Sequence, residues 1–224
     1  MNRPSFFSAI IFDMDGLMLD TERIGRLAWQ RAAAEWGYTL PDDLYLAVVG
    51  RTVRDTQEVF RRAFEPDFPF EAMYQRKQQH VEAYIAEHGL PLKAGLLELL
   101  DLVERLSLPK TVATSTARPQ ALKKLALTGL LDRFEIIVCG NEIPNGKPAP
   151  DIFLAAAERL RQPAQYCLVL EDSEAGIRGA HAAGMTSVMV PDLKPPTPEI
   201  AALAYQVLPS LTEVSVLLQN LTKL

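Results

Sequence analysis

The amino-acid sequence predicts a three-layer α/β fold, in which a parallel sheet lies between two layers of helices and a helical bundle is inserted after the first strand. From residue 90 to residue 190, short apolar runs alternate with segments at helical spacing, as in proteins whose parallel strands are joined by helical crossovers. Residues 20–89 show helical patterns only. We therefore expect a core domain of residues 1–19 and 90–224 and a helical cap domain of residues 20–89.

The first strand is predicted at the apolar run that starts at Ile10 and leads directly into Asp13 and Asp15. Residues two apart in an extended chain point to the same side, so both carboxylates can share one site. Gly16 then allows a sharp turn or a close approach to a ligand. Because neighbouring carboxylates repel unless a proton or cation separates them, this pattern favours a metal site or an acid/base role. A solvated turn rich in Asp and Gly is the simpler alternative for this stretch alone.

The helical insertion is expected to begin with a helix that Asp20 or Thr21 caps and that Gly37 ends. Prolines and a glycine interrupt the later helical patterns, up to about residue 88. This favours a small bundle rather than one long helix. The spacing predicts an apolar face on the first helix, formed by Ile24, Leu27, Ala28, Ala32 and Trp36.

The rest of the core alternates between strands and helices. Strands are predicted at residues 110–113, 135–139, 166–170 and 187–190. Helices are predicted at residues 96–106, 119–127 and 150–160, and a further helix begins at Ser173 and ends at Gly184. The opening strand belongs to the same sheet, which helices cover on both faces.

Polar side chains follow several of these strands. Taken singly, each has a plain explanation as a helix cap, a solvated lysine or a polar turn. Together they favour one site, because ligands bind beyond the carboxyl ends of parallel strands. Carboxylates suit Mg²⁺, whereas hydroxyl, backbone N–H and ammonium groups can hold phosphate oxygens. The side chains concerned are Asp13, Asp15, Thr114, Ser115, Lys147, Glu171 and Asp172.

Four stretches, in this order, resemble the four motifs of the haloacid dehalogenase-like (HAD) superfamily. They read Asp-Met-Asp-Gly from Asp13, Val-Ala-Thr-Ser from Val112, Gly-Lys-Pro-Ala-Pro-Asp from Gly146, and Leu-Glu-Asp-Ser-Glu-Ala-Gly from Leu170. The helical insertion is similar to the small cap of the phosphatase and β-phosphoglucomutase-like branch. The resemblance implies a Rossmann-like core and phosphoryl transfer, and it covers nearly the whole chain.

The resemblance also implies roles for individual residues. Asp13 is expected to be the nucleophile that becomes an aspartyl phosphate. Asp15 is expected to protonate the leaving alcohol and to deprotonate the attacking water, while its backbone carbonyl binds the metal. Lys147 is expected to keep Asp13 ionised. The expected phosphate or substrate ligands are Gly16, Thr114, Ser115, Lys147 and Arg51, and the expected Mg²⁺ ligands are Asp13, Asp15, Glu171 and Asp172.

The motifs favour phosphate hydrolysis among the reactions of the superfamily. Dehalogenases lack the second aspartate of the first motif, which is Asp15 here. Phosphonate hydrolysis depends on a cap lysine, and the insertion has only Lys77, which we expect to face solvent from its polar run. A β-phosphoglucomutase-like mutase is the alternative, but it uses a cap histidine and a lysine where this chain has Gly25 and Val49. A receiver-like phospho-switch domain, which is not an enzyme, has its acidic pair on an earlier strand than the phosphorylated aspartate.

The composition agrees with a globular enzyme that acts on a small-molecule substrate. The 224 residues are 48% hydrophobic and 23% charged, and the net charge of −5 comes without a long basic run that could follow nucleic acid. No apolar run approaches the ~20 residues of a membrane span. Cys139 and Cys167 lie in apolar runs, which favours buried free thiols in a reducing compartment. We therefore expect a cytoplasmic, Mg²⁺-dependent phosphatase of a sugar phosphate or nucleoside monophosphate, as a monomer or weak dimer without nucleic-acid or membrane partners.

Overall fold

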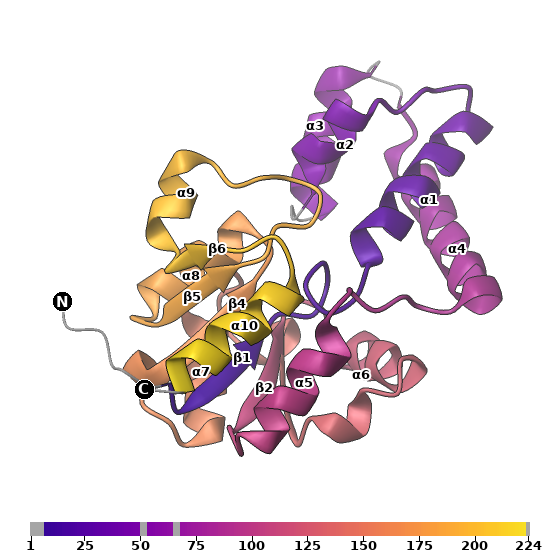
Figure 1. The fold of residues 1–224 in the computed structure, drawn as a ribbon. Coiled ribbons are helices and arrows are strands. Elements are labelled where there is room, and N and C mark those ends of the chain that lie inside the picture. Colours follow the sequence, from indigo (N-terminus) through magenta and orange to yellow (C-terminus); the bar gives the residue numbers. More distant parts are fainter. Residues whose placement is uncertain (1–6, 50–52, 65–67, 223–224) are drawn as a thin grey trace. The chain divides into compact units, whose positions relative to one another are not determined.

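The computed structural model describes residues 7–49, 53–64 and 68–222. The chain divides into two compact units (Figure 1). One unit contains Met1–Asp20 and Pro91–Leu224, and the other contains Thr21–Leu90. The chain therefore leaves the first unit after its opening strand and returns to it seventy residues later.

A parallel six-stranded sheet forms the centre of the first unit, which confirms the predicted α/β fold. Its spatial order is β3-β2-β1-β4-β5-β6. The opening strand is central, because Ile11 lies opposite Thr111 on one neighbour and Val169 on the other. The sequence did not predict the short edge strand β6. The strands are β1 (Ala9–Phe12), β2 (Lys110–Thr114), β3 (Ile136–Cys139), β4 (Cys167–Glu171), β5 (Thr186–Met189) and β6 (Gln206–Val207).

Helices cover both faces of this sheet. On one face, Phe153 and neighbouring residues of α7 pack on alternate strand residues such as Ile11 and Val169. Over the other face, α5 and α10 lie in front of the strands in Figure 1 and contact each other. Side chains on both faces of the strands are therefore buried, which explains their continuous apolar runs. The helices of this unit are α5 (Leu96–Arg105), α6 (Arg118–Leu127), α7 (Asp151–Leu160), α8 (Glu174–Ala182), α9 (Pro198–Leu203) and α10 (Leu211–Thr222).

The second unit is a bundle of helices with an aromatic core. Trp29 and Phe60 meet edge to face with ring centroids 5.0 Å apart, and Phe70 packs on Trp29 at 5.7 Å. Phe60 is fully buried. Aromatic side chains bury large areas, so a few of them stabilise a bundle of this size. Its helices are α1 (Thr21–Glu35), α2 (Asp42–Val48), α3 (Val53–Ala63) and α4 (Phe70–His88).

The predicted apolar face of α1 is partly wrong. Leu27 is 41% exposed and Trp36 is 40% exposed, whereas Trp29 and Ala33 are buried. Trp36 lies beyond Glu35, where the helix ends. The buried stripe is therefore rotated from the predicted one, because α1 packs mainly against α4 and this contact selects which residues are covered.

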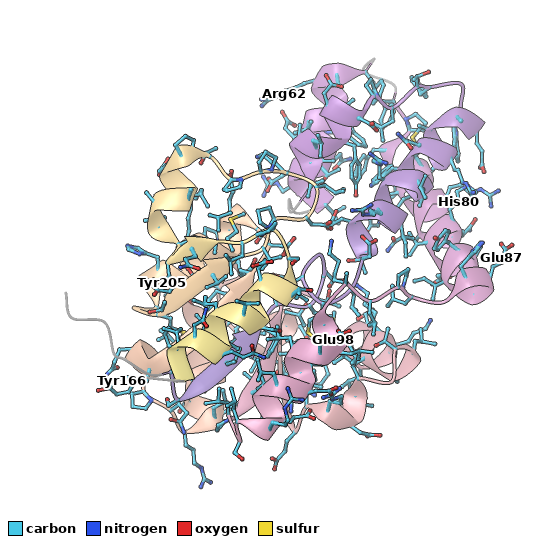
Figure 2. All side chains as sticks on the ribbon, viewed as in Figure 1. Arg62, His80, Glu87, Glu98, Tyr166 and Tyr205 are labelled. Carbon is cyan, nitrogen blue, oxygen red and sulfur yellow. The ribbon has the colours of Figure 1, made fainter. Side chains whose placement is uncertain are left out.

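A polar cluster on the surface also joins α1 to α4. Glu35 accepts a hydrogen bond from Nε of Arg76 at 2.5 Å, and its other oxygen lies 2.7 Å from Nε2 of His80. Figure 2 shows His80 on the side of α4. The nearby cation lowers the pKa of Glu35, chiefly through the hydrogen bond from Arg76. All three groups are partly exposed, so the cluster contributes little to stability.

Both cysteines are buried and free, at the carboxyl end of β3 and the start of β4. Burial raises the pKa of the Cys139 thiol, and it raises the pKa of Cys167 to about 11. Since the thiolate is the reactive form of cysteine, burial makes both thiols less reactive than an exposed one. No helix within the described residues is both long and apolar enough to cross a membrane.

Candidate active site

The central strand β1 places Asp13 at the carboxyl edge of the sheet. The backbone N–H of Asp13 donates to the carbonyl oxygen of Leu170 at 3.0 Å, so parallel pairing with β4 continues one residue beyond the strand. The Asp13 side chain is nearly buried, at 9% exposed. A carboxylate at this depth needs a partner, because an unpaired buried charge is costly.

Lys147 is that partner, and it reaches the site from the segment between β3 and α7. Its Nζ atom donates to Oδ1 of Asp13 and to Oε1 of Glu171, the latter at 2.5 Å. A third, longer contact of 3.3 Å reaches the carbonyl oxygen of Ala113. The lysine side chain is only 6% exposed. One ammonium group therefore bridges two carboxylates from the ends of neighbouring strands.

The electrostatic balance of this cluster is negative. Burial raises the pKa of Asp13 to about 8; Lys147 opposes this shift, and the charge of Glu171 adds to it. The neighbouring carboxylates Asp13 and Glu171 raise the pKa of Lys147 against the effect of burial, so the lysine stays charged. Lys147 acts on Asp13 in the expected direction, since it lowers the pKa of this carboxyl, but burial and the charge of Glu171 outweigh it. Two carboxylates share one positive charge, and a further cation would favour the charged form of Asp13.

Glu171 is fully buried and bonded at both oxygens. Its Oε2 atom accepts hydrogen bonds from the backbone N–H and the hydroxyl of Ser173, at 2.8 and 2.9 Å. Ser173 also caps α8, as predicted, since its Oγ accepts from the N–H of Gly176 at 3.0 Å. A methyl group at Gly176 would collide with the Glu171 carboxylate, so only glycine lets the helix begin so close to it.

Gly16 brings the first loop against Asp172. The glycine has φ +89°, a left-handed conformation that other residues rarely adopt. A methyl group at Gly16 would collide with the carboxylate of Asp172. The turn after β1 is closed by the N–H of Gly16, which donates to the carbonyl oxygen of Leu19 at 2.9 Å. The structure thus brings Asp172 next to the loop that carries Asp15.

Asp15 has partners that the sequence did not predict. Its Oδ2 atom accepts from the hydroxyl of Thr116 at 2.7 Å, and its Oδ1 atom lies 2.5 Å from Nζ of Lys124. Thr116 follows β2, and Lys124 lies in the last turn of α6. Thr116 belongs to the polar run after the strand, so its position could have been anticipated. No local pattern in α6 distinguishes Lys124 from the neighbouring Lys123.

The predicted phosphate-binding hydroxyls lie at the end of β2. Thr114 is buried at 1% exposed, and its Oγ1 atom accepts from the backbone N–H of Thr116 at 3.1 Å. Ser115 is exposed. Its backbone carbonyl lies so close to Gly140 that a methyl group there would not fit. Two contacts therefore fix the loop after β2: the hydrogen bond from Thr116 to Thr114, and the close packing of Ser115 on Gly140 after β3.

Among the described residues, no group of three or more His, Cys, Asp or Glu side chains is arranged to hold a metal ion by itself. A magnesium site does not require three such side chains, since Mg²⁺ is commonly bound by one or two carboxylates, waters and a substrate phosphate. The predicted substrate residue Arg51 lies outside the described residues.

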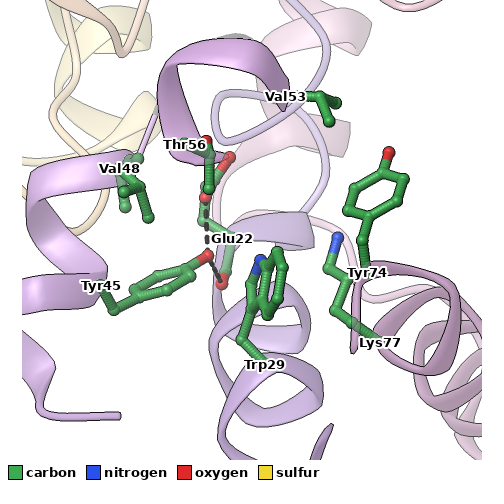
Figure 3. A pocket seen from close by; sticks show the side chains of 9 residues that line it. Glu22, Trp29, Tyr45, Val48, Val53, Thr56, Tyr74 and Lys77 are labelled. Carbon is green, nitrogen blue, oxygen red and sulfur yellow. Dashed lines mark hydrogen bonds between the residues drawn. The ribbon is translucent and has the colours of Figure 1, made fainter. Parts of the chain in front are cut away.

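The helical unit has a pocket of its own, of about 250 Å³ (Figure 3). The indole of Trp29 and the ring of Tyr74 provide aromatic walls, with Lys77 between them in Figure 3. Oη of Tyr45 lies 3.0 Å from Oε2 of Glu22, which supplies a carboxylate to the same pocket. Lys77 is therefore half-buried rather than fully exposed, although its Nζ also donates to the exposed side chain of Gln78 at 3.2 Å. Its helix turns this one residue of a polar run toward the pocket while the adjacent positions stay outside.

Comparison with known proteins identifies the family. The sequence profile described as Haloacid dehalogenase-like hydrolase matches residues 10–190. The chain therefore belongs to the haloacid dehalogenase-like hydrolases.

Two curated relatives and one solved structure show what the chain is similar to. It is 37% identical over 209 residues to a Drosophila melanogaster protein named "Probable pseudouridine-5'-phosphatase", covering 91% of this chain and 89% of the relative. It is 32% identical to a phosphorylated carbohydrates phosphatase of Thermotoga maritima, covering 80% of this chain and 83% of the relative. The structure of a HAD family hydrolase from Deinococcus radiodurans, with bound phosphate and sodium, has a TM-score of 0.84 and 26% identity, covering 99% of both chains.

Proposed function

We propose that this chain is a phosphatase that hydrolyses a small phosphorylated metabolite, either a sugar phosphate or a nucleoside monophosphate. The observation that carries the proposal is the bridge from Lys147 to Asp13 and Glu171 at the carboxyl edge of the sheet. It holds a nucleophile next to a fixed positive charge, which suits attack on an anionic phosphoryl group. The relatives named as phosphatases of carbohydrates and of a nucleotide support this substrate range.

The reaction would proceed in two steps. In the first, a carboxylate oxygen of Asp13 attacks phosphorus, the ester P–O bond breaks, and protonated Asp15 gives its proton to the leaving oxygen. In the second, Asp15 takes a proton from a water molecule as that water attacks phosphorus, and the bond between Asp13 and phosphorus breaks. Lys147, the hydroxyls of Thr114 and Ser115, and backbone N–H groups near them would hold the phosphoryl oxygens. Gly16 stays a prediction as a phosphate ligand, since the carboxylate of Asp172 occupies the space where its Cβ atom would lie.

The residues present fit a magnesium ion. All donors in the proposed set are oxygens, and two buried carboxylates share a single ammonium, which leaves negative charge for a cation to balance. Bound Mg²⁺ would reduce the repulsion between the substrate phosphate and the nucleophile. The proposed ligands are the side chains of Asp13, Glu171 and Asp172 and the backbone carbonyl of Asp15.

We assign substrate selection to the unit Thr21–Leu90, acting as a cap. Its pocket combines aromatic walls with one carboxylate, Glu22, and one ammonium, Lys77, so it offers both stacking surfaces and partners for hydroxyl groups. Arg51 stays a prediction as a substrate ligand. The cytoplasmic location and the monomeric or weakly dimeric state stay predictions as well.

The mutase alternative is less well supported. A mutase of the related branch requires a cap histidine where this chain has Gly25. A Cβ atom added at Gly25 would lie 3.0 Å from Oη of Tyr45, so the phenol already occupies the space beside it. Val49, which replaces the required lysine, lines the cap pocket without adding a charge.

The test is a panel of phosphorylated metabolites assayed for free phosphate, with and without EDTA. We expect Mg²⁺-dependent release from sugar phosphates or nucleoside monophosphates, complete loss in Asp13→Asn, and nearly complete loss in Asp15→Asn. Full activity in either folded variant would overturn the mechanism. Conversion of a hexose 1-phosphate to its 6-phosphate without phosphate release would favour the mutase instead.

A further inference from the structure

The carboxylate of Asp15 is held at both of its oxygens by one segment of the chain. Thr116, on the turn after β2, donates to Oδ2, and Lys124, on the helix that follows, lies against Oδ1 at 2.5 Å. The two side chains of the ion pair are each about one quarter exposed, at 26% for Lys124 and 24% for Asp15. A single strand–turn–helix unit therefore determines the orientation of this side chain.

We propose that Lys124 is a positioning residue for proton transfer, which holds Asp15 in the orientation that serves both steps of hydrolysis. The proposal rests on the proposed function, in which Asp15 exchanges a proton with the leaving oxygen and then with water. Lys124 acts through Asp15 and lies outside the four sequence motifs.

Geometry explains why two contacts matter. An aspartate side chain rotates about two bonds, and one hydrogen bond leaves the second rotation largely open. A contact at each oxygen restricts both rotations, and correct orientation of a reacting group can account for a large part of catalysis. The N–H of Thr116 also donates to Oγ1 of Thr114 at 3.1 Å. Thr116 therefore links Asp15 to the hydroxyl of Thr114, which we propose as a ligand of the phosphoryl group.

The helix offers a matched control. Lys123 is adjacent to Lys124 and exposed, whereas Lys124 is only partly exposed and points to Asp15. Successive residues on a helix point in directions about 100° apart, so the same substitution at the two positions separates an effect on Asp15 from a general effect of charge or helix propensity.

The experiment compares two substrates by their kcat/KM values, which report the steps up to release of the leaving group. A nitrophenolate departs readily without a proton, whereas a sugar alkoxide requires one. For Lys124→Met we expect a loss of about 10- to 100-fold on the sugar phosphate and less than about 3-fold on nitrophenyl phosphate. Lys124→Arg should recover part of the loss, and Lys123→Met should behave as wild type.

A second readout follows the later step. If water activation by Asp15 is slowed, Lys124→Met should release a burst of about one nitrophenol per enzyme before slow turnover, because phosphorylated Asp13 accumulates. Thermal unfolding of each variant shows whether it is folded. Equal losses on both substrates, or no loss on either, would overturn the role of Lys124 while leaving the phosphatase intact. A wild-type protein without Asp13-dependent phosphate release would instead overturn the proposed function and this inference with it.

Discussion

Lys147 donates a hydrogen bond to the carboxylate of Asp13, although 134 residues separate the two in the sequence. The contact exists because both residues follow strands whose carboxyl ends meet at one edge of the sheet. Since the same ammonium also reaches Glu171, loss of this one side chain would leave two buried carboxylates without their shared partner.

Lys147→Met is therefore expected to lower the free energy of unfolding by about 3–5 kcal/mol, because removing one member of a buried ion pair leaves the other charge uncompensated. Urea denaturation at pH 7 measures this. Adding Glu171→Gln should restore part of the stability, since it removes the buried negative charge that Lys147 no longer balances. If the single variant unfolds at the same urea concentration as wild type, the bridge is not a stabilising feature.

Asp13→Asn is expected to stabilise the metal-free protein at neutral pH. The pKa of Asp13 is raised from 3.8 to about 8, chiefly by burial. The folded state then holds more protons than the unfolded state between these values, so stability falls as pH rises through this window. The amide carries no charge and removes this dependence. We expect a gain of about 1–3 kcal/mol at pH 7 and almost none near pH 4.

Thermal unfolding in EDTA, followed from pH 4 to pH 8, checks this prediction. The difference in melting temperature between the variant and wild type should widen as pH rises. Mg²⁺ should then raise the melting temperature of wild type more than that of Asp13→Asn, because the variant lacks one proposed ligand. A variant that is less stable than wild type at every pH would contradict the electrostatic argument.

Lys77→Met should weaken substrate binding without changing the chemical step. Lys77 lines the cap pocket, and a hydrogen bond to a charged group contributes about 1.5–3 kcal/mol. We expect KM for a sugar phosphate or nucleoside monophosphate to rise about 10-fold or more, with kcat nearly unchanged. Arg62→Met serves as the control, since Arg62 is an exposed cation of the same unit, with 78% of its side chain accessible. Equal KM values for the two variants would exclude a role for the pocket.

Glu142→Gln tests a structural ion pair near the end of β3. Hydrogen bonding to Arg118 is the main cause that lowers the pKa of Glu142 from 4.5 to about 2. The carboxylate therefore stabilises the folded state above pH 4.5, and this contribution is lost as pH falls toward 2. We expect the variant to be less stable at pH 7 by about 1–2 kcal/mol, after allowance for partial exposure. Acid titration by circular dichroism should show the two proteins converging below about pH 3.

Most of the fold follows from local patterns. Apolar runs and helix signals place the strands and helices to within a few residues, because both depend on side-chain spacing and on caps such as Ser173. The meeting of Asp13, Lys147 and Glu171 also follows, since the topology of a parallel sheet brings strand ends together.

Three features depended on the tertiary structure. Packing against α4 decided that Trp29, rather than Leu27, is buried on α1. The direction of one helical side chain decided that Lys77 enters the cap pocket.

A contact across 109 residues decided that Lys124 holds Asp15. The common reason is that a helix presents side chains in every direction, and only its neighbours in space determine which of them become buried or paired. The sequence by itself therefore determined the class of protein and predicted which polar residues meet at the carboxyl edge of the sheet. The folded chain decided which side chains contact Asp15 and which line the pocket of the helical unit.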